Sequence, residues 1–368
     1  MRQIFAALLL AGTVAGLCSG QAPPRKLSSM PIEDLLNVEV TSVSKTQQKL
    51  SETASAIYVI TQDEIQRSGA TNIPDLLRMV PGLDVGQINA NTWAISARGF
   101  NGRYANNLMV LLDGRSIYLP TFGGVYWDVL DVPLADIDRL EVIRGPGGSM
   151  WGANAVNGII NIITKKAGIT KGAMVEAGAG NLQPGFGTVQ YGSSAGKTTD
   201  YRVYSNYRSQ SQLPGINGAD GGDGWNVLRG GFRADSTVSA KDTLTFEGDV
   251  YTGRENQFSK VLPSLGSGIQ SVERSMDLSG GFIQGIWNHE FSVRSTSILE
   301  ISYDRNHHGN QVNERESVLN LDFQHEYKWK QRQDLLGGMS LYNSGLTTNG
   351  ALAVSFNPPE TTVRLKPR

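Results

Sequence analysis

From residue 172 onward, apolar and polar residues alternate with a period of two in segments of about ten residues. In residues 318–329, the largely apolar face carries Leu319, Leu321, Phe323, His325, Tyr327 and Trp329. The opposite, mostly polar face carries Val318, Asn320, Asp322, Gln324, Glu326 and Lys328. Residues 201–208, 242–252 and 297–304 show the same alternation. This pattern is typical of transmembrane β-barrel strands, whose apolar face contacts lipid and whose polar face lines a wet interior.

A soluble β-sandwich also alternates, with the apolar face forming a shared core. The segment length favours the barrel, because ~10 residues span a bilayer and sandwich strands are usually shorter. We expect short turns at 196–199, 240–242, 293–295 and 330–333, and longer loops at 209–224, 254–278 and 305–315. Outer-membrane barrels alternate short periplasmic turns with long extracellular loops in this way. We therefore expect about ten antiparallel barrel strands, the last at 351–356.

Composition excludes other classes of protein. The net charge of −1 argues against a nucleic-acid binder, which usually carries a basic face. Glycine reaches 43 of 368 residues and charged residues only 18%, which suits turn-rich strands with uncharged polar positions. No stretch after residue 20 approaches the ~20 apolar residues of a spanning helix.

The first twenty residues have the pattern of a secretory signal peptide: Arg2, an apolar run to Leu17, then small residues before a cleavage site near Gly20. The alternative is a buried N-terminal helix. The single cysteine, Cys18, lies inside this segment, so the mature chain would carry none. Lipidation of Cys18 is the other possibility, although the preceding Leu17 is larger than the small residue usual there.

Residues 50–166 predict a compact α/β region. A capping box at Thr61 and Glu64 opens a helix that Gly69 ends, and Asn72 caps a second helix that ends at 81–82. Strands are expected at 57–60, 83–85, 93–96, 108–112, 140–143 and 159–163, in a small mixed sheet. Asp113 and Gly114 predict a hairpin turn. The glycine-rich residues 145–152 lack the lysine of a phosphate loop and predict a tight turn.

Residues 38–166 resemble the plug domain of TonB-dependent outer-membrane receptors. The similar stretches are Ala54–Gln62, Gly69–Leu83, Ile95–Phe100, Val110–Arg115, Ile137–Pro146 and Trp151–Ile162. The resemblance implies a mixed α/β plug inside an antiparallel barrel of 22 strands. It divides the chain into signal peptide (1–20), N-terminal extension (21–48), plug (49–166) and the N-terminal part of the barrel (172–368). Because only about ten strands are present and the end lacks a terminal aromatic residue, we expect an incomplete chain.

In this family the periplasmic protein TonB pulls a short segment before the plug by strand addition. Glu39, Val40, Thr41, Ser42 and Val43 resemble such a TonB box, being extended and β-branched. The alternative is an ordinary first strand of the plug. About 20 residues separate the cleavage site from this box, which leaves no room for an additional signalling domain.

The resemblance also implies that Arg98 and Arg144 anchor the plug to acidic residues of the barrel wall, with Glu141 joining the network. Arginine can pair with carboxylates through two hydrogen bonds. The candidate wall partners are Glu176 and Glu247. The alternative is that both arginines are solvated surface residues.

The family's activity implies uptake of a scarce, bulky ligand, of which ferric siderophores are the commonest and haem, cobalamin and oligosaccharides the others. Ligand-facing candidates are Trp93, Tyr118, Phe122 and Tyr126, or these aromatic residues pack against the barrel. The alternative function is a passive porin or surface adhesin in the outer membrane.

No nucleophile–base set indicates an enzyme, and no cofactor is expected. His289, His307, His308 and His325 do not form a metal-binding pattern. We expect His307 and His308 to lie in a solvated loop, with metal binding there as the alternative.

Overall fold

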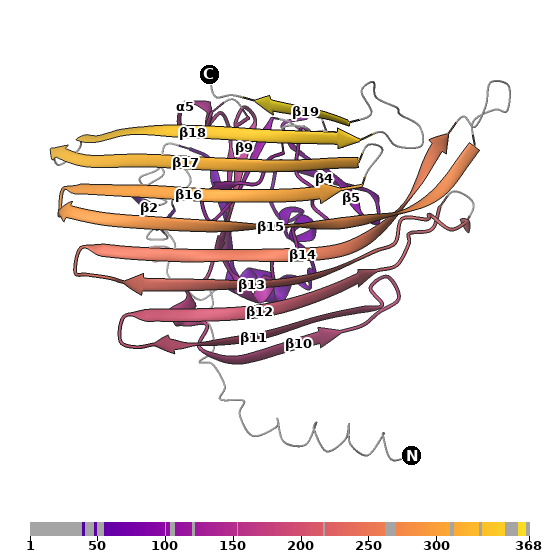
Figure 1. The fold of residues 1–368 in the computed structure, drawn as a ribbon, viewed down its shortest axis with the longest axis horizontal. Coiled ribbons are helices and arrows are strands. Elements are labelled where there is room, and N and C mark those ends of the chain that lie inside the picture. The colour runs from indigo at the N-terminus through magenta and orange to yellow at the C-terminus, as the bar shows by residue number, and fades with distance from the viewer. Residues whose placement is uncertain are drawn as a thin grey trace, which may run out of the picture.

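The computed structural model describes residues 39–40, 48–49, 55–99, 101–103, 107–119, 122–152, 154–215, 218–261, 270–309, 313–330, 333–349 and 360–365. The expected signal peptide, residues 41–43 of the candidate TonB box and the expected strand at 351–356 lie outside this part. The described chain forms an α/β region followed by a large sheet of long strands that covers one side of it (Figure 1).

The α/β region is built on a five-stranded sheet in the order β3-β8-β9-β6-β7. Its strands are β3 (Ile57–Thr61), β6 (Leu108–Leu112), β7 (Arg115–Ser116), β8 (Ile137–Arg144) and β9 (Gly158–Thr164). The β6–β9 pair is parallel and the others are antiparallel, so the sheet is mixed as expected. A separate hairpin, which we did not expect, is made by β4 (Leu83–Asn89) and β5 (Thr92–Ala97).

The helices of the α/β region follow their capping residues. Helix α3 (Gln62–Ser68) begins at the predicted capping box, in which Glu64 accepts from the Thr61 amide at 2.9 Å, and it ends at Gly69. Helix α4 (Ile73–Leu77) begins at Asn72 but ends earlier than predicted, at Arg78. The glycine-rich stretch contains the four-residue helix α5 (Gly148–Trp151), where a turn alone was expected.

An apolar core joins the helices to this sheet. Its fully buried members come from several elements and include Ile60, Leu76, Leu77, Leu140, Ile160 and Ile162. The 3-10 helices Leu134–Asp136 and Ala167–Ile169 flank β8 and the exit from β9. The α/β region therefore has a core of its own, and its contacts with the large sheet add to that core.

The large sheet has ten antiparallel strands paired in chain order. They are β10 (Gly172–Gly178), β11 (Gly185–Ala195), β12 (Thr199–Gln210), β13 (Trp225–Thr237), β14 (Asp242–Val261), β15 (Gln270–Ser292), β16 (Ser295–His308), β17 (Asn313–Lys330), β18 (Gln333–Asn349) and β19 (Glu360–Leu365). In the described residues the sheet is open, with β10 and β19 at its edges. The prediction of about ten strands is confirmed, and the described strands do not close into a barrel.

The connections alternate as predicted, but two of the long ones are shorter than expected. The short turns after β11, β13 and β15 gather at one end of the sheet, on the left in Figure 1, where β17 also ends. The loop after β12 agrees with its prediction. The predicted loops at 254–278 and 305–315 are wrong over most of their length, because β14, β15, β16 and β17 continue through them.

The two faces of the strands are reversed relative to a soluble protein. Val203, Val250 and Ile301 are 46%, 69% and 45% exposed. Their neighbours Arg202, Asp249 and Ser302 are buried against the α/β region. An outward apolar face with a buried polar face is the arrangement of a barrel strand in lipid, and it excludes the sandwich alternative. In the part of the chain that the structure describes, no helix has the length and apolar composition needed to cross a membrane.

Candidate functional site

Four arginines on the polar faces of β12 and β13 point from the large sheet toward the α/β region: Arg202, Arg208, Arg229 and Arg233. All four are buried. Opposite them, residues 128–141 of the α/β region carry Asp128, Asp131, Asp136, Asp138 and Glu141. The candidate site is therefore the polar interface between these strands and this acidic segment.

At this interface a direct ion pair joins Arg208 to Asp131. Arg208 Nε donates to Asp131 Oδ1 at 2.7 Å, and the two side chains are 8% and 6% exposed. Asn206, two residues earlier on β12, donates to the main-chain carbonyl of Asp131 at 3.2 Å and also to its carboxylate. Three hydrogen bonds from two side chains of one strand thus hold a single aspartate, which fixes the register between the two parts.

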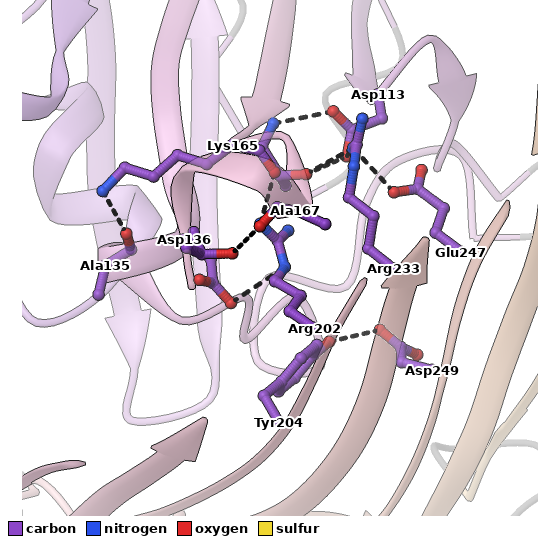
Figure 2. Close-up of polar contacts among 12 residues, drawn as sticks. Asp113, Ala135, Asp136, Lys165, Ala167, Arg202, Tyr204, Arg233, Glu247 and Asp249 are labelled. Carbon is purple, nitrogen blue, oxygen red and sulfur yellow. Dashed lines mark hydrogen bonds and ion pairs between the residues drawn. The ribbon is translucent and has the colours of Figure 1, made fainter. Parts of the chain in front are cut away.

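Arg202 makes a weaker contact with Asp136. Its Nε lies 3.7 Å from Asp136 Oδ2, beyond hydrogen-bond range, and its guanidinium donates to the carbonyl of Lys165 (Figure 2). Burial raises the pKa of the Asp136 carboxyl, although Arg202 and Lys165 act in the opposite direction. The charged form of Asp136 is therefore less favoured than it would be in water, so this pair contributes little net attraction.

Arg233 connects two carboxylates of different origin. Its Nη1 donates to Glu247 of β14 at 3.0 Å and lies 3.6 Å from Asp113 of the β6–β7 turn (Figure 2). The same nitrogen donates to Thr164 Oγ1 at 3.0 Å. Asp113 is held from its own side, because it accepts from the amide and hydroxyl of Thr164 at 2.8 Å each.

The predicted β6–β7 turn presses against the large sheet. Asp113 and Gly114 both have positive φ, 49° and 89°, as the predicted Asp-Gly hairpin turn requires. A Cβ at Gly114 would lie 3.0 Å from Glu300 Oε2, so the turn approaches β16 closely. The following residue, Arg115, pairs with Asp304 of β16 and stacks on Phe282 of β15 at 3.6 Å.

A second set of contacts involves the β4–β5 turn. Trp225 of β13 donates from Nε1 to the carbonyl of Ala90 at 2.7 Å, and Asp223 accepts from the Ala90 amide at 2.7 Å. Asn91 donates to the carbonyl of Asn256 at 3.1 Å. Trp225 and three other residues of the sheet, Val227, Tyr251 and Leu278, complete the apolar core on this side.

The structure places the expected anchor residues differently from these contacts. Arg98 donates to the carbonyl of Arg144 at 3.0 Å, and Arg144 donates to the carbonyl of Pro81 at 2.8 Å. Glu141 is fully buried and accepts from Arg139 at 2.9 Å. These hydrogen bonds stay within the α/β region, so anchoring by Arg98, Glu141 and Arg144 stays a prediction.

The two expected wall partners also differ from expectation. Glu176 on β10 is exposed, whereas Glu247 is buried beside Arg233. The expected anchors were arginines of the α/β region paired with acids of the strands, whereas the described interface is mostly the reverse. Two signals were available: Arg202 and Arg208 on the polar face of β12, and the run of aspartates from 128 to 138.

The candidate ligand-facing aromatic residues pack inside the interface. Trp93, Phe122 and Tyr126 are buried, and Tyr118 is half-buried. Phe122 stacks on Tyr126 at 4.1 Å, and Tyr126 stacks on His308 of β16 at 3.9 Å. This packing favours the alternative in which they contact the strands. The prediction that His307 and His308 lie in a solvated loop is wrong, because both lie in β16 and His308 is buried.

Of the candidate TonB box, Glu39 and Val40 form β1 (Glu39–Val40), which pairs with β2 (Gln48–Lys49). Val40 is buried. This pairing supports the alternative of an ordinary strand, but it is only two residues long, so a competing strand has few hydrogen bonds to displace.

Comparison with protein families identifies the α/β region. Residues 49–159 match the family model described as the TonB-dependent Receptor Plug Domain. Residues 49–159 therefore form a domain of the TonB-dependent receptor plug type. We therefore call the α/β region the plug and the large sheet the wall.

Similar proteins agree with this assignment. The chain is 29% identical over 204 residues to the vitamin B12 transporter BtuB of Vibrio cholerae, covering 54% of this chain and 32% of the transporter. It is 35% identical over 144 residues to BtuB of Vibrio vulnificus, covering 39% of this chain and 23% of that protein. The chain thus spans about a third or less of the length of these curated relatives.

Solved structures share the fold. The pyoverdine outer-membrane receptor FpvA of Pseudomonas aeruginosa, bound to pyoverdine, has a TM-score of 0.67 at 17% identity, over 88% of this chain and 51% of the receptor. The ferric-catecholate import receptor Fiu of E. coli has a TM-score of 0.65 at 17% identity, over 87% of this chain and 54% of Fiu. In both, the match covers most of this chain and about half of the other receptor.

Proposed function

We propose that this chain belongs to an outer-membrane receptor that takes up a scarce, bulky ligand with energy transmitted by TonB. The observation that carries the proposal is the polar interface between plug and wall. Arg208 forms a hydrogen-bonded ion pair with Asp131. Arg202 and Arg233 lie 3.7 and 3.6 Å from Asp136 and Asp113. Water can replace such contacts one at a time, whereas a continuous apolar seal would oppose movement of the plug.

The location follows from the same features. The N-terminal twenty residues support export, and the outward apolar faces of the strands support insertion in the outer membrane. We expect the mature chain to begin after Gly20 and to fractionate with the outer membrane. N-terminal sequencing of the membrane-extracted protein measures both properties, and full-length protein in the cytoplasm would contradict them.

For the ligand we propose a ferric siderophore, the class named for several structural neighbours. Cobalamin is the second candidate, because the relatives similar in sequence are vitamin B12 transporters. Neither likeness identifies the ligand by itself, since the plug and the first strands are the shared part.

The test uses cells that lack their own receptors and express this one. Labelled ferric siderophores and cyanocobalamin are supplied with and without a protonophore. We expect one ligand class to bind in both conditions and to accumulate only in energised cells. Accumulation of ligand that survives the protonophore would favour the passive porin. Binding of ligand to the cells without accumulation would favour the adhesin.

A further inference from the structure

Three buried, chemistry-bearing side chains meet at the long-loop end of the wall, away from the arginine contacts. Asp128 belongs to the plug, Glu255 to β14, and His308 is the last residue of β16. They are 2%, 3% and 6% exposed. Each comes from a different segment of the chain, so the cluster exists only when the plug is seated against the wall.

The distances from His308 to the two carboxylates are longer than those of direct hydrogen bonds. His308 Nε2 lies 3.5 Å from Asp128 Oδ2, and His308 Nδ1 lies 3.5 Å from Glu255 Oε1. Charge-assisted hydrogen bonds are about 2.7–2.9 Å long. Both ring nitrogens of His308 and Oδ2 of Asp128 are buried without a hydrogen-bond partner. Unpartnered polar atoms of this kind are uncommon in native structures and call for a missing partner.

The three side chains lie close enough together to approach one metal ion. One oxygen of each carboxylate and one nitrogen of His308 lie within 4.8 Å of one another. Zinc binds nitrogen and carboxylate oxygen at about 2.0–2.2 Å in tetrahedral geometry, which places neighbouring ligands roughly 3.3–3.6 Å apart. An ion takes one ring nitrogen, and the other nitrogen then donates to a carboxylate, as is usual for metal-bound histidine.

The cavity at this cluster fits an ion rather than an organic ligand. Its volume is about 10 Å³, close to one water-sized sphere. Trp93, Phe122 and Tyr126 line it, and Tyr126 lies parallel to the His308 ring with 8° between the planes. The stacking fixes the orientation of the imidazole. Arg103 also lines the cavity. A divalent ion beside this positive charge requires negative charge, which the two carboxylates supply.

We propose that Asp128, Glu255 and His308 bind a divalent transition-metal ion of the zinc class between plug and wall. An imidazole with two carboxylates suits zinc and its neighbours, whereas calcium takes six to eight oxygen ligands. The bound ion joins the plug to β14 and β16 at the end of the wall opposite the short turns. This site is separate from the uptake proposed above, and its existence does not depend on the identity of the transported ligand.

The test measures Zn²⁺ binding to the purified protein after chelator treatment, by titration calorimetry and metal analysis. We expect one Zn²⁺ per chain, and binding at least ~10-fold weaker in His308→Gln and Asp128→Asn. Bound Co²⁺ should give the visible absorption of a tetrahedral site in the unmodified protein only.

A control variant separates loss of a ligand from loss of the fold. His325→Gln removes a histidine near the short turns, which contacts Ser297 at 2.8 Å. It should bind Zn²⁺ as the unmodified protein does. If His308→Gln fails to fold, the isosteric Glu255→Gln replaces it. Absence of Zn²⁺ binding by the unmodified protein, or equal binding by the ligand variants, would overturn the proposal.

Discussion

Arg208 of the wall donates a 2.7 Å hydrogen bond to Asp131 of the plug, and both side chains are almost completely buried. Because the pair is buried, each charge depends on the other for its stabilisation. Removing either partner leaves a charge in a low-dielectric interface, which typically costs about 3–5 kcal/mol, while the net stability of the intact pair is much smaller.

Truncation at this pair should therefore loosen the plug. We predict that Asp131→Ala and Arg208→Ala each destabilise the seated plug by about 3 kcal/mol or more. The measurement is hydrogen exchange of the β6 and β9 amides, and the double variant should lose less than the sum of the two. Arg254→Ala is the matched control, because its pair with Asp277 is 65% and 76% exposed and should contribute only about 0–1 kcal/mol. Equal effects of Arg208→Ala and Arg254→Ala would contradict the assignment.

The orientation of the wall predicts opposite tolerances for neighbouring residues. Leu319→Arg places a charge on the outward face and should cost about 2–4 kcal/mol near the bilayer midplane. Asn320→Arg, one residue along β17, points inward and should cost much less. Folding titrations in lipid vesicles give both values. Similar costs at the two positions would argue that the outward face does not contact lipid.

The β6–β7 turn offers a backbone test. Gly114 has a φ of 89°, and an added Cβ would lie 3.0 Å from Glu300 Oε2. Gly114→Ala should therefore destabilise the plug by roughly 1–2 kcal/mol and displace the neighbouring Arg115 from Asp304. Gly337→Ala is the control, because no atom lies within 4 Å of the added Cβ and its φ is not positive. Thermal unfolding of the two variants compares them, and a neutral Gly114→Ala would show that the turn is not held against the wall.

Most of the fold was predictable from the sequence because the sequence signals for it are local. The Thr61–Glu64 capping box, the Asp113–Gly114 turn and the period-two strands each depend on neighbouring residues, and each is confirmed. The lengths of β14 and β15 were underestimated, because polar residues at their long-loop ends resemble a loop in sequence while main-chain pairing continues to Val261 and Gln270.

The interface was less predictable, because it joins residues far apart in the chain. Arg208 and Asp131 are 77 positions apart, and their pairing depends on how the plug rests on β12. His307 and His308 were expected in a loop because Asn306 and Gly309 flank them. In the fold Tyr126 stacks on the His308 ring, and Asp128 and Glu255 lie beside it.

Energy coupling through the segment before the plug is the central claim, and Val40→Pro tests it most directly. Proline removes an amide and fixes φ, so strand addition by TonB should fail at this position. Val40→Ala keeps the amide and is the matched control, although Val40 is buried and the alanine variant loses some packing. Binding and accumulation of labelled ligand are measured in the same cells. The account predicts normal surface binding for both variants and loss of accumulation for proline alone. Normal accumulation by the proline variant would contradict it.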